Sequence, residues 1–182
     1  SAWFDNLLPD SQAIRDRLAR HFGATAVTPF ALLEKIGRDC IGAVQVVPED
    51  EEPRDVRKIT GRPLSTKDVA HVLRDALLVG APNADGEDHD LRLSLAGAQE
   101  KTALLWHKDG WWLPTGTTPT THILKLPLGL AGNTGYDIEH SVHNEWLCSR
   151  VLAAYGLPVA RSEIATFEEH TVLVVERFDR QR

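Results

Sequence analysis

The pattern of apolar residues divides the chain into a helical first part and a strand-rich second part. In the first part, apolar residues recur every three or four positions and predict helices over about residues 11–22, 28–36 and 65–78. Between the second and third helix, the β-branched run 40–47 predicts a strand. Residues that favour a helix start stand at the head of each helix: Ser11, Thr28 with Pro29, and Ser65 with Asp68.

A polar, turn-rich segment separates the two parts. Residues 81–90 contain Pro, Gly, Asn and several acidic residues, and few residues that a core could bury. We therefore predict an N-terminal domain over residues 1–80, a linker over 81–90 and a second domain over 91–182.

Alternation of apolar and polar residues marks the second part. Lys108-Asp109-Gly110, between two strands, is typical of a hairpin turn. One helix, over about residues 138–155, interrupts the strands and carries Val142, Leu147, Val151 and Leu152 as its apolar residues. The predicted fold class is therefore α+β. The predicted strands cover about residues 91–95, 102–107, 111–113, 121–126, 162–166 and 171–176.

Composition and charge narrow the function classes. A net charge of −6 argues against a broad nucleic-acid surface. No apolar run approaches the roughly 18 residues that span a bilayer, so we expect no membrane segment. Cys40 and Cys148 lie far apart, and His140 and His143 lack a third ligand, so neither a disulfide framework nor a metal site is predicted. We expect a cytoplasmic protein, and, because the sequence does not begin with Met, a piece of a longer one.

The order of elements in the second part is that of a protein-kinase N-lobe: a hairpin, a strand, a helix and two more strands. Lys125 ends the run His122-Ile-Leu-Lys125, which resembles the kinase strand motif with its phosphate-binding lysine. Such an ammonium needs a carboxylate to hold it in place. Glu145, in the middle of the predicted helix, is the first choice, and Glu139, near its start, is the alternative. On spacing alone, a surface lysine on an edge strand fits Lys125 as well.

The segment Ala96-Gly-Ala-Gln-Glu-Lys101 is a second candidate for phosphate chemistry. Small residues let backbone N–H groups approach an anion closely. Gly97 is its only glycine, so the segment is neither a kinase glycine-rich loop nor a Walker A loop. On composition alone, an ordinary hairpin turn fits it better.

Several longer motifs resemble those of one family, the HipA bacterial serine/threonine-protein kinases, which are the toxin halves of HipBA toxin–antitoxin modules associated with persistence. The resemblance implies a kinase-like fold with an extra N-terminal subdomain. Its motifs are Phe4-Asp-Asn-Leu-Leu-Pro-Asp-Ser11, Ile36-Gly-Arg-Asp-Cys40, Ser94-Leu-Ala-Gly-Ala-Gln-Glu-Lys-Thr102, Thr118-Pro-Thr-Thr-His-Ile-Leu-Lys-Leu-Pro127, Asn144-Glu145 and Val175-Glu-Arg-Phe-Asp-Arg180.

The resemblance also implies roles for single residues. Lys125 falls on the family's ATP-binding lysine, and Glu176 and Phe178 fall on the hinge, whose main-chain groups would hydrogen-bond adenine. Ser94 matches the serine that family members autophosphorylate to switch themselves off. The ATP-covering loop falls on Leu95, Ala96, Gly97, Ala98, Gln99, Glu100, Lys101 and Thr102.

Other implied parts lie outside this chain. The catalytic Asp and the Asn and Asp ligands for Mg²⁺ belong to a C-lobe after the hinge, so we predict that the C-lobe is absent here and that this fragment alone is inactive. The implied activity of the full-length protein is phosphoryl transfer from ATP to a protein, with glutamyl-tRNA synthetase as the family precedent. Implied partners are a HipB-like antitoxin and, through it, operator DNA. The alternative is a non-catalytic binding module or pseudokinase lobe that docks such an antitoxin.

Overall fold

The computed structural model describes residues 2–42, 44–47, 49, 58–78, 99–128, 130–131 and 136–180. They form helices and an antiparallel sheet, which confirms a mixed helix-and-sheet fold. The chain divides into two compact units. The first contains Ser1–Arg62, Leu77–Ala98 and Leu113–Pro119, and the second contains Pro63–Ala76, Gln99–Trp112 and Thr120–Arg182. The predicted linker 81–90 lies outside the described residues, and the domain limits at residues 80 and 91 stay a prediction.

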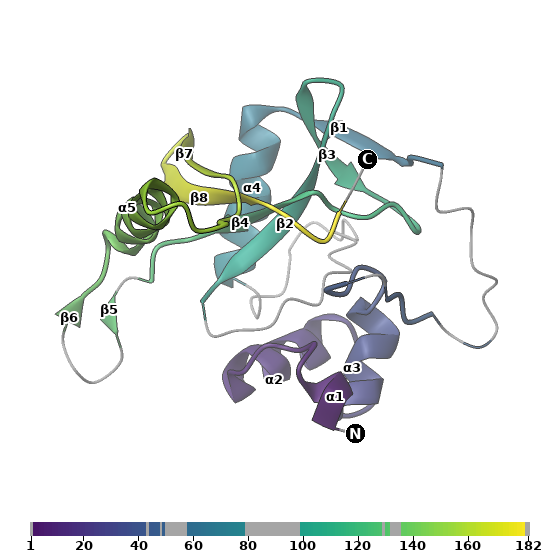
Figure 1. Ribbon diagram of the computed structural model, residues 1–182. Coiled ribbons are helices and arrows are strands. Elements are labelled where there is room, and N and C mark those ends of the chain that lie inside the picture. The colour runs from purple at the N-terminus through teal and green to yellow at the C-terminus, as the bar shows by residue number, and fades with distance from the viewer. Residues whose placement is uncertain are drawn as a thin grey trace. The chain divides into compact units, whose positions relative to one another are not determined.

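The first unit contains three helices: α1 (Ala2–Asp5), α2 (Gln12–His21) and α3 (Pro29–Ile36) (Figure 1). The predictions for the second and third of these are confirmed. The Thr28 hydroxyl accepts a hydrogen bond from the Ala31 N–H at 3.4 Å, and Pro29 takes the first helical position. The helices bury a common core made of Leu7, Leu8, Ala19, Leu32, Leu33, Ile36 and Cys40.

The predicted strand over residues 40–47 is wrong for the part that the structure describes. Val44 and Val46 pack against the helical core and join no sheet. The Val46 N–H donates to the Gly37 carbonyl at 2.8 Å, at the C-terminal end of α3. A Cβ atom at Gly37 would lie 2.9 Å from the Val46 Cβ and 2.5 Å from the Leu33 carbonyl oxygen. Gly37 thus permits a close approach that gives the β-branched residues a helix to pack on.

Six strands form one sheet in the order β1-β3-β2-β4-β8-β7 (Figure 1). The predicted strands from residue 102 onward are confirmed, whereas the one predicted over 91–95 lies outside the described residues. Lys108 and Asp109 have φ angles of 51° and 60°, as a two-residue hairpin turn requires. The strands are β1 Gly61–Leu64, β2 Lys101–His107, β3 Gly110–Pro114, β4 His122–Lys125, β7 Ser162–Phe167 and β8 His170–Glu176, and a separate pair is β5 Leu130–Ala131 with β6 Tyr136–Asp137.

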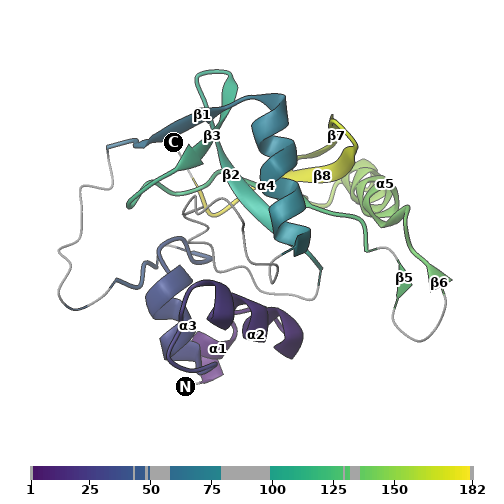
Figure 2. The same cartoon turned by 180° about the vertical axis from the view of Figure 1, so that it is seen from behind.

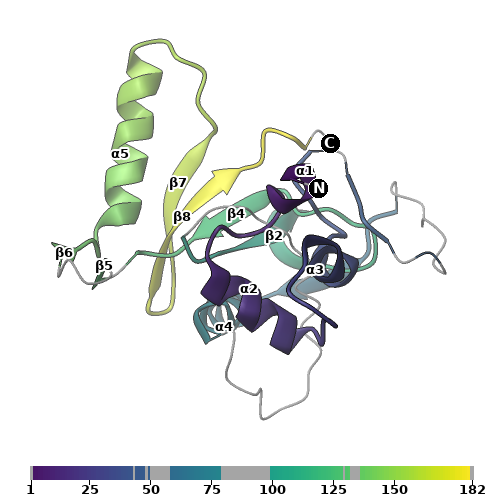
Figure 3. The same cartoon turned by 90° about the horizontal axis from the view of Figure 1, so that it is seen from below.

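Two helices lie on opposite sides of this sheet, α4 (Thr66–Leu78) and α5 (Ser141–Ala154) (Figures 2 and 3). The start of α4 is capped reciprocally, because the Ser65 N–H donates to Asp68 Oδ2 at 2.8 Å and the Asp68 N–H donates to Ser65 Oγ at 3.2 Å. Its predicted inward residues are all buried: Val69, Val72, Leu73 and Ala76.

The helix α5 packs on β7 and β8, but it differs from its prediction in two respects. It begins at Ser141 and not near residue 138, because the Ser141 N–H closes a turn onto the Ile138 carbonyl at 2.9 Å. Of its four apolar residues named above, only Val142 is buried. Leu147, Val151 and Leu152 are exposed, since the sheet reaches only one side of the helix.

Among the helices that the structure describes, none is long and apolar enough to cross a bilayer.

Candidate functional site

Lys125, the last residue of β4, forms an ion pair with Glu145 of α5. The Lys125 Nζ lies 2.5 Å from Glu145 Oε1. Side chains alternate along a strand, so Lys125 projects to the side of the sheet on which α5 packs. The exposed fractions of the two side chains are 25% and 39%, which leaves the pair open to a ligand. The structure therefore brings Lys125 to Glu145, whereas Glu139 lies in the turn before α5.

Lys101, the first residue of β2, lies directly opposite Lys125 in the antiparallel register. Opposed residues project to the same face with Cβ atoms about 4.5–5.5 Å apart. Lys101 Nζ donates a hydrogen bond to the Gln99 carbonyl at 3.3 Å. Like charges that face each other destabilise a strand pair, and an anion that contacts both lysines would reduce this repulsion.

The other described residues of the predicted covering loop extend the β2–β4 pairing. Gln99 Nε2 donates to the Leu126 carbonyl at 2.7 Å, and the Leu126 N–H donates to the Glu100 carbonyl at 3.1 Å. Thr102 is buried on the face opposite to Lys101. The remaining predicted loop residues 95–98, together with the predicted modification site Ser94, lie outside the described residues.

The predicted hinge residues follow the end of β8. Glu176 is the last residue of this strand, and its N–H donates to the Arg161 carbonyl at 2.9 Å. Phe178, two residues later, has an exposed fraction of 85%. None of the backbone hydrogen bonds among the described residues uses the Phe178 N–H.

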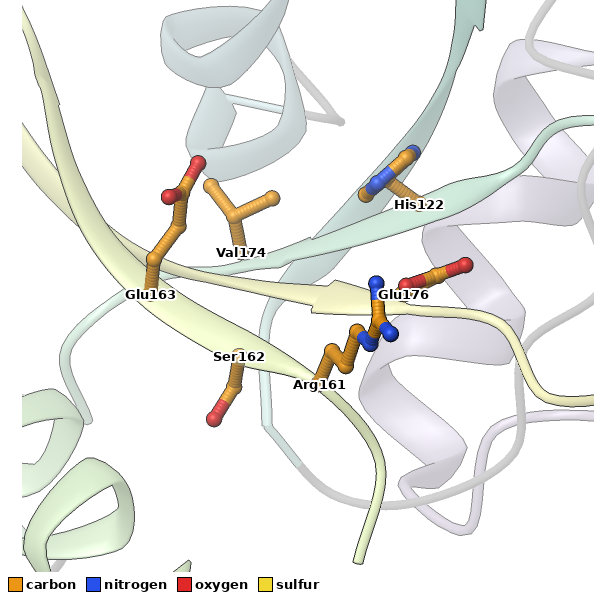
Figure 4. Close-up of a pocket in the computed structure, with 6 residues that line it drawn as sticks. All are labelled: His122, Arg161, Ser162, Glu163, Val174 and Glu176. Carbon is orange, nitrogen blue, oxygen red and sulfur yellow. The ribbon is translucent and has the colours of Figure 1, made fainter. Parts of the chain in front are cut away.

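A pocket of about 210 Å³ lies beside the hinge strand, on the face that α4 covers and not on the face of Lys125 (Figure 4). His122 and Glu176 oppose each other in the register and project into it with Arg161 and Glu163, whereas Ser162 points the other way. Burial lowers the pKa of His122, against the opposing effect of the carboxylates of Glu176 and Glu163. Because the side chain of Glu176 is directed into this pocket, only its main chain can serve a ligand near Lys125.

The hinge motif also contains two residues to which sequence reasoning gave no role, Arg177 and Asp179. The structure buries the Arg177 guanidinium and joins it to the Asp179 carboxylate by two hydrogen bonds. The sequence contains one signal of this buried contact, namely an arginine and an aspartate two residues apart just after a buried strand.

Two family descriptions match the chain, each over one of its parts. The HipA N-terminal domain matches residues 1–47, and the HipA-like C-terminal domain matches residues 93–182. The chain is 37% identical over 182 residues to the candidate kinase Y4mE of Sinorhizobium fredii. It is 30% identical over 181 residues to the serine/threonine-protein kinase toxin HipA of Shewanella oneidensis.

The fold has a close counterpart among solved structures. A chain in the complex of HipA, HipB and operator DNA from the Shewanella oneidensis toxin–antitoxin system superposes with a TM-score of 0.72 at 30% identity. The superposition covers all of the present chain and 39% of the chain in the solved complex. Together, the two family matches, the relatives and this fold establish that the chain belongs to the HipA family. It spans 41% and 38% of the lengths of the two relatives.

Proposed function

We propose that this chain is the ATP-binding portion of a toxin serine/threonine-protein kinase, with the second unit as its kinase-like N-lobe. The observation that carries the proposal is the arrangement of Lys101 and Lys125 on neighbouring strands, with Glu145 holding Lys125. Opposed residues of two neighbouring strands project to the same face, so both ammonium groups can contact the phosphates of one nucleotide. The Glu145 carboxylate fixes the direction of the Lys125 ammonium.

The hinge main chain fits the adenine of the same nucleotide. An adenine presents an amino donor and ring-nitrogen acceptors. The Glu176 carbonyl can accept from the amino group, and the Phe178 N–H can donate to a ring nitrogen. The large exposed fraction of Phe178 leaves this edge of the hinge accessible. The base and the phosphates would thus be held by β8 and by the β2–β4 pair of the same sheet.

The described residues do not fit a Mg²⁺ site. No cluster of three or more His, Cys, Asp or Glu side chains that could hold a metal occurs among them. We propose that a C-lobe following the hinge supplies the Mg²⁺ ligands and the catalytic Asp. The chain's own contribution is to bind and orient the nucleotide, and we propose that the isolated fragment does not transfer phosphate.

Ser94 is the proposed autophosphorylation site. It stands immediately before the covering loop in the sequence. A phosphate on Ser94 would add about two negative charges and would compete with the ATP phosphates for the backbone donors of the covering loop, or displace that loop from the site. Autophosphorylation would then switch the kinase off.

Substrate and partners are proposed from the relatives. The solved relative is a complex of HipA with HipB and operator DNA, which supports a HipB-like antitoxin and, through it, operator DNA as partners of this protein. The protein substrate is proposed to be glutamyl-tRNA synthetase, with growth arrest and persistence as the consequence. The rival interpretation as a non-catalytic module is not favoured, because relatives over the whole of this chain are named as kinases.

A labelling experiment tests the proposal. The protein expressed from its whole reading frame is incubated with γ-labelled ATP and Mg²⁺, and the labelled residue is identified by mass spectrometry. We expect label on Ser94 and its loss in Lys125→Ala. Undiminished labelling of the Lys125→Ala protein would overturn the role of Lys125, and label confined to other residues would overturn that of Ser94.

A further inference from the structure

Arg177 stands between the two proposed hinge residues, and its guanidinium is one of the most fully buried charged groups of the described chain. Its side chain has an exposed fraction of 1%, and that of Asp179 has 13%. Nε and Nη2 of Arg177 donate to Oδ1 and Oδ2 of Asp179 at 3.1 and 3.0 Å. This two-pronged contact fixes both the position and the plane of the guanidinium.

Further bonds tie this pair to β4 and to the chain that follows. Arg177 Nη1 donates to the Thr120 hydroxyl at 2.8 Å, and the Arg177 N–H donates to the Thr121 carbonyl at 2.9 Å. Arg180 Nη1 donates to the carbonyl oxygen and to Oδ2 of Asp179, at 3.1 and 3.0 Å. Hydrogen bonds therefore hold the segment after β8 in place both before and after Phe178.

We infer that Arg177 and Asp179 are positioning residues that determine base specificity by setting the hinge main chain. Arg177 lies between the Glu176 carbonyl and the Phe178 N–H. The two-pronged contact between Arg177 and Asp179 therefore sets the spacing and direction of this acceptor and donor. Guanine presents a carbonyl oxygen where adenine presents an amino group, and a hinge held in one geometry accepts only one of the two patterns. The carboxylate of Asp179 is engaged by two arginines and serves this positioning and not proton transfer.

This inference rests on the proposed function, because it needs a nucleotide at the hinge. Lysine in place of Arg177 keeps the charge but cannot make the two-pronged contact, and Asp179→Asn keeps the shape but loses the charge. Thr120→Val removes one bond and retains the two-pronged contact, so it provides a milder variant if Arg177→Lys does not fold. Arg74→Lys is the matched control, since Arg74 pairs with Glu169 at 2.8 Å on the exposed surface.

The experiment measures dissociation constants for ATP and GTP and steady-state kinetics of the protein expressed from its whole reading frame. We expect Arg177→Lys and Asp179→Asn each to raise the KM for ATP and to reduce the ATP-over-GTP preference by about tenfold, with a smaller effect of Thr120→Val. At saturating ATP, kcat should change less than KM. The double variant should resemble the single ones, because both residues act through one contact.

Two results would overturn the inference. One is an ATP-over-GTP preference within about twofold of wild type in folded Asp179→Asn and Arg177→Lys proteins. The other is a loss of kcat at unchanged KM, which would place Asp179 in the chemical step. If the wild-type protein binds neither nucleotide, the proposed function itself fails. If the wild-type protein and its hinge variants bind ATP equally well, only the inference about Arg177 and Asp179 fails.

Discussion

Lys101 and Lys125 face each other across the β2–β4 pair, so two like charges occupy a position where like charges destabilise a sheet. Glu145 pairs with Lys125, and the Gln99 carbonyl accepts from Lys101. Both ammonium groups lie on the same face of the sheet, so the phosphate oxygens of one ligand can contact both. We propose this face as the phosphate-binding site.

We expect Lys101→Gln to stabilise the anion-free fold by about 0.5 kcal/mol, because it removes the repulsion between the opposed lysines. The same substitution should reduce the stabilisation that tripolyphosphate gives the wild type. Urea unfolding, followed by the fluorescence of the tryptophans on β2 and β3, measures both effects. Lys108→Gln in the exposed β2–β3 turn is the control. Equal stabilisation of Lys101→Gln and wild type by tripolyphosphate would contradict the prediction.

Ser65→Ala should destabilise the second unit by about 1 kcal/mol, because it removes the hydroxyl that accepts from the Asp68 N–H at the start of α4. Ser65→Thr keeps a hydroxyl and should lose only a few tenths of that amount. The measurement is the free energy of unfolding from urea titrations. Equal losses in the two variants would rule out the cap as the cause.

His122 should make folding pH-dependent. Burial lowers its pKa in the folded state below the ordinary value of 6.5, so the unfolded chain binds more protons in the interval between the two values. The contribution of His122 to stability is therefore fully present above about pH 6.5 and decreases as the pH falls through that interval.

His122→Asn tests this sign directly. The difference in unfolding free energy between wild type and His122→Asn should shift against the wild type as the pH is lowered from 8 to 5, an interval that brackets about pH 6.5. His21→Asn is the control, since His21 is exposed at the end of α2. A pH-independent difference would mean that the imidazole of His122 titrates alike in the folded and unfolded chain.

Much of the fold follows from local sequence signals that tertiary packing supports. The Ser65 and Asp68 cap, the row Val69, Val72 and Leu73, and the Lys108-Asp109 turn each depend on residues close in the sequence. Strand β1 gave no such signal, because Pro63 argues against a strand. The proline is tolerated because β1 lies at the edge of the sheet, where a missing N–H donor leaves no strand partner unpaired.

The incorrect strand over residues 40–47 has a related cause. β-branched residues favour a half-buried extended conformation whatever they pack against. In this chain they pack against the helical core beside α3, where Gly37 allows a close approach, and not against another strand. A sequence pattern cannot tell which partner an extended segment will find.

The candidate site was predictable in part. The strand period placed Lys125 on one face and the helix length placed Glu145 near it, whereas the choice between Glu145 and Glu139 needed the actual start of α5. The register that sets Lys101 against Lys125, and the buried contact between Arg177 and Asp179, depend on pairings between distant strands and on tertiary packing. Neither follows from spacing.

The most direct test of the central claim is the equilibrium affinity for Mg²⁺-ATP of the protein expressed from its whole reading frame, measured by titration calorimetry for wild type, Lys125→Met and Lys67→Met. Lys67 is exposed on α4 and serves as the matched control. If the nucleotide binds through the Lys125–Glu145 pair, Lys125→Met should reduce the affinity for Mg²⁺-ATP by about tenfold or more, and Lys67→Met should keep the wild-type affinity. Wild-type affinity in a folded Lys125→Met protein would contradict it.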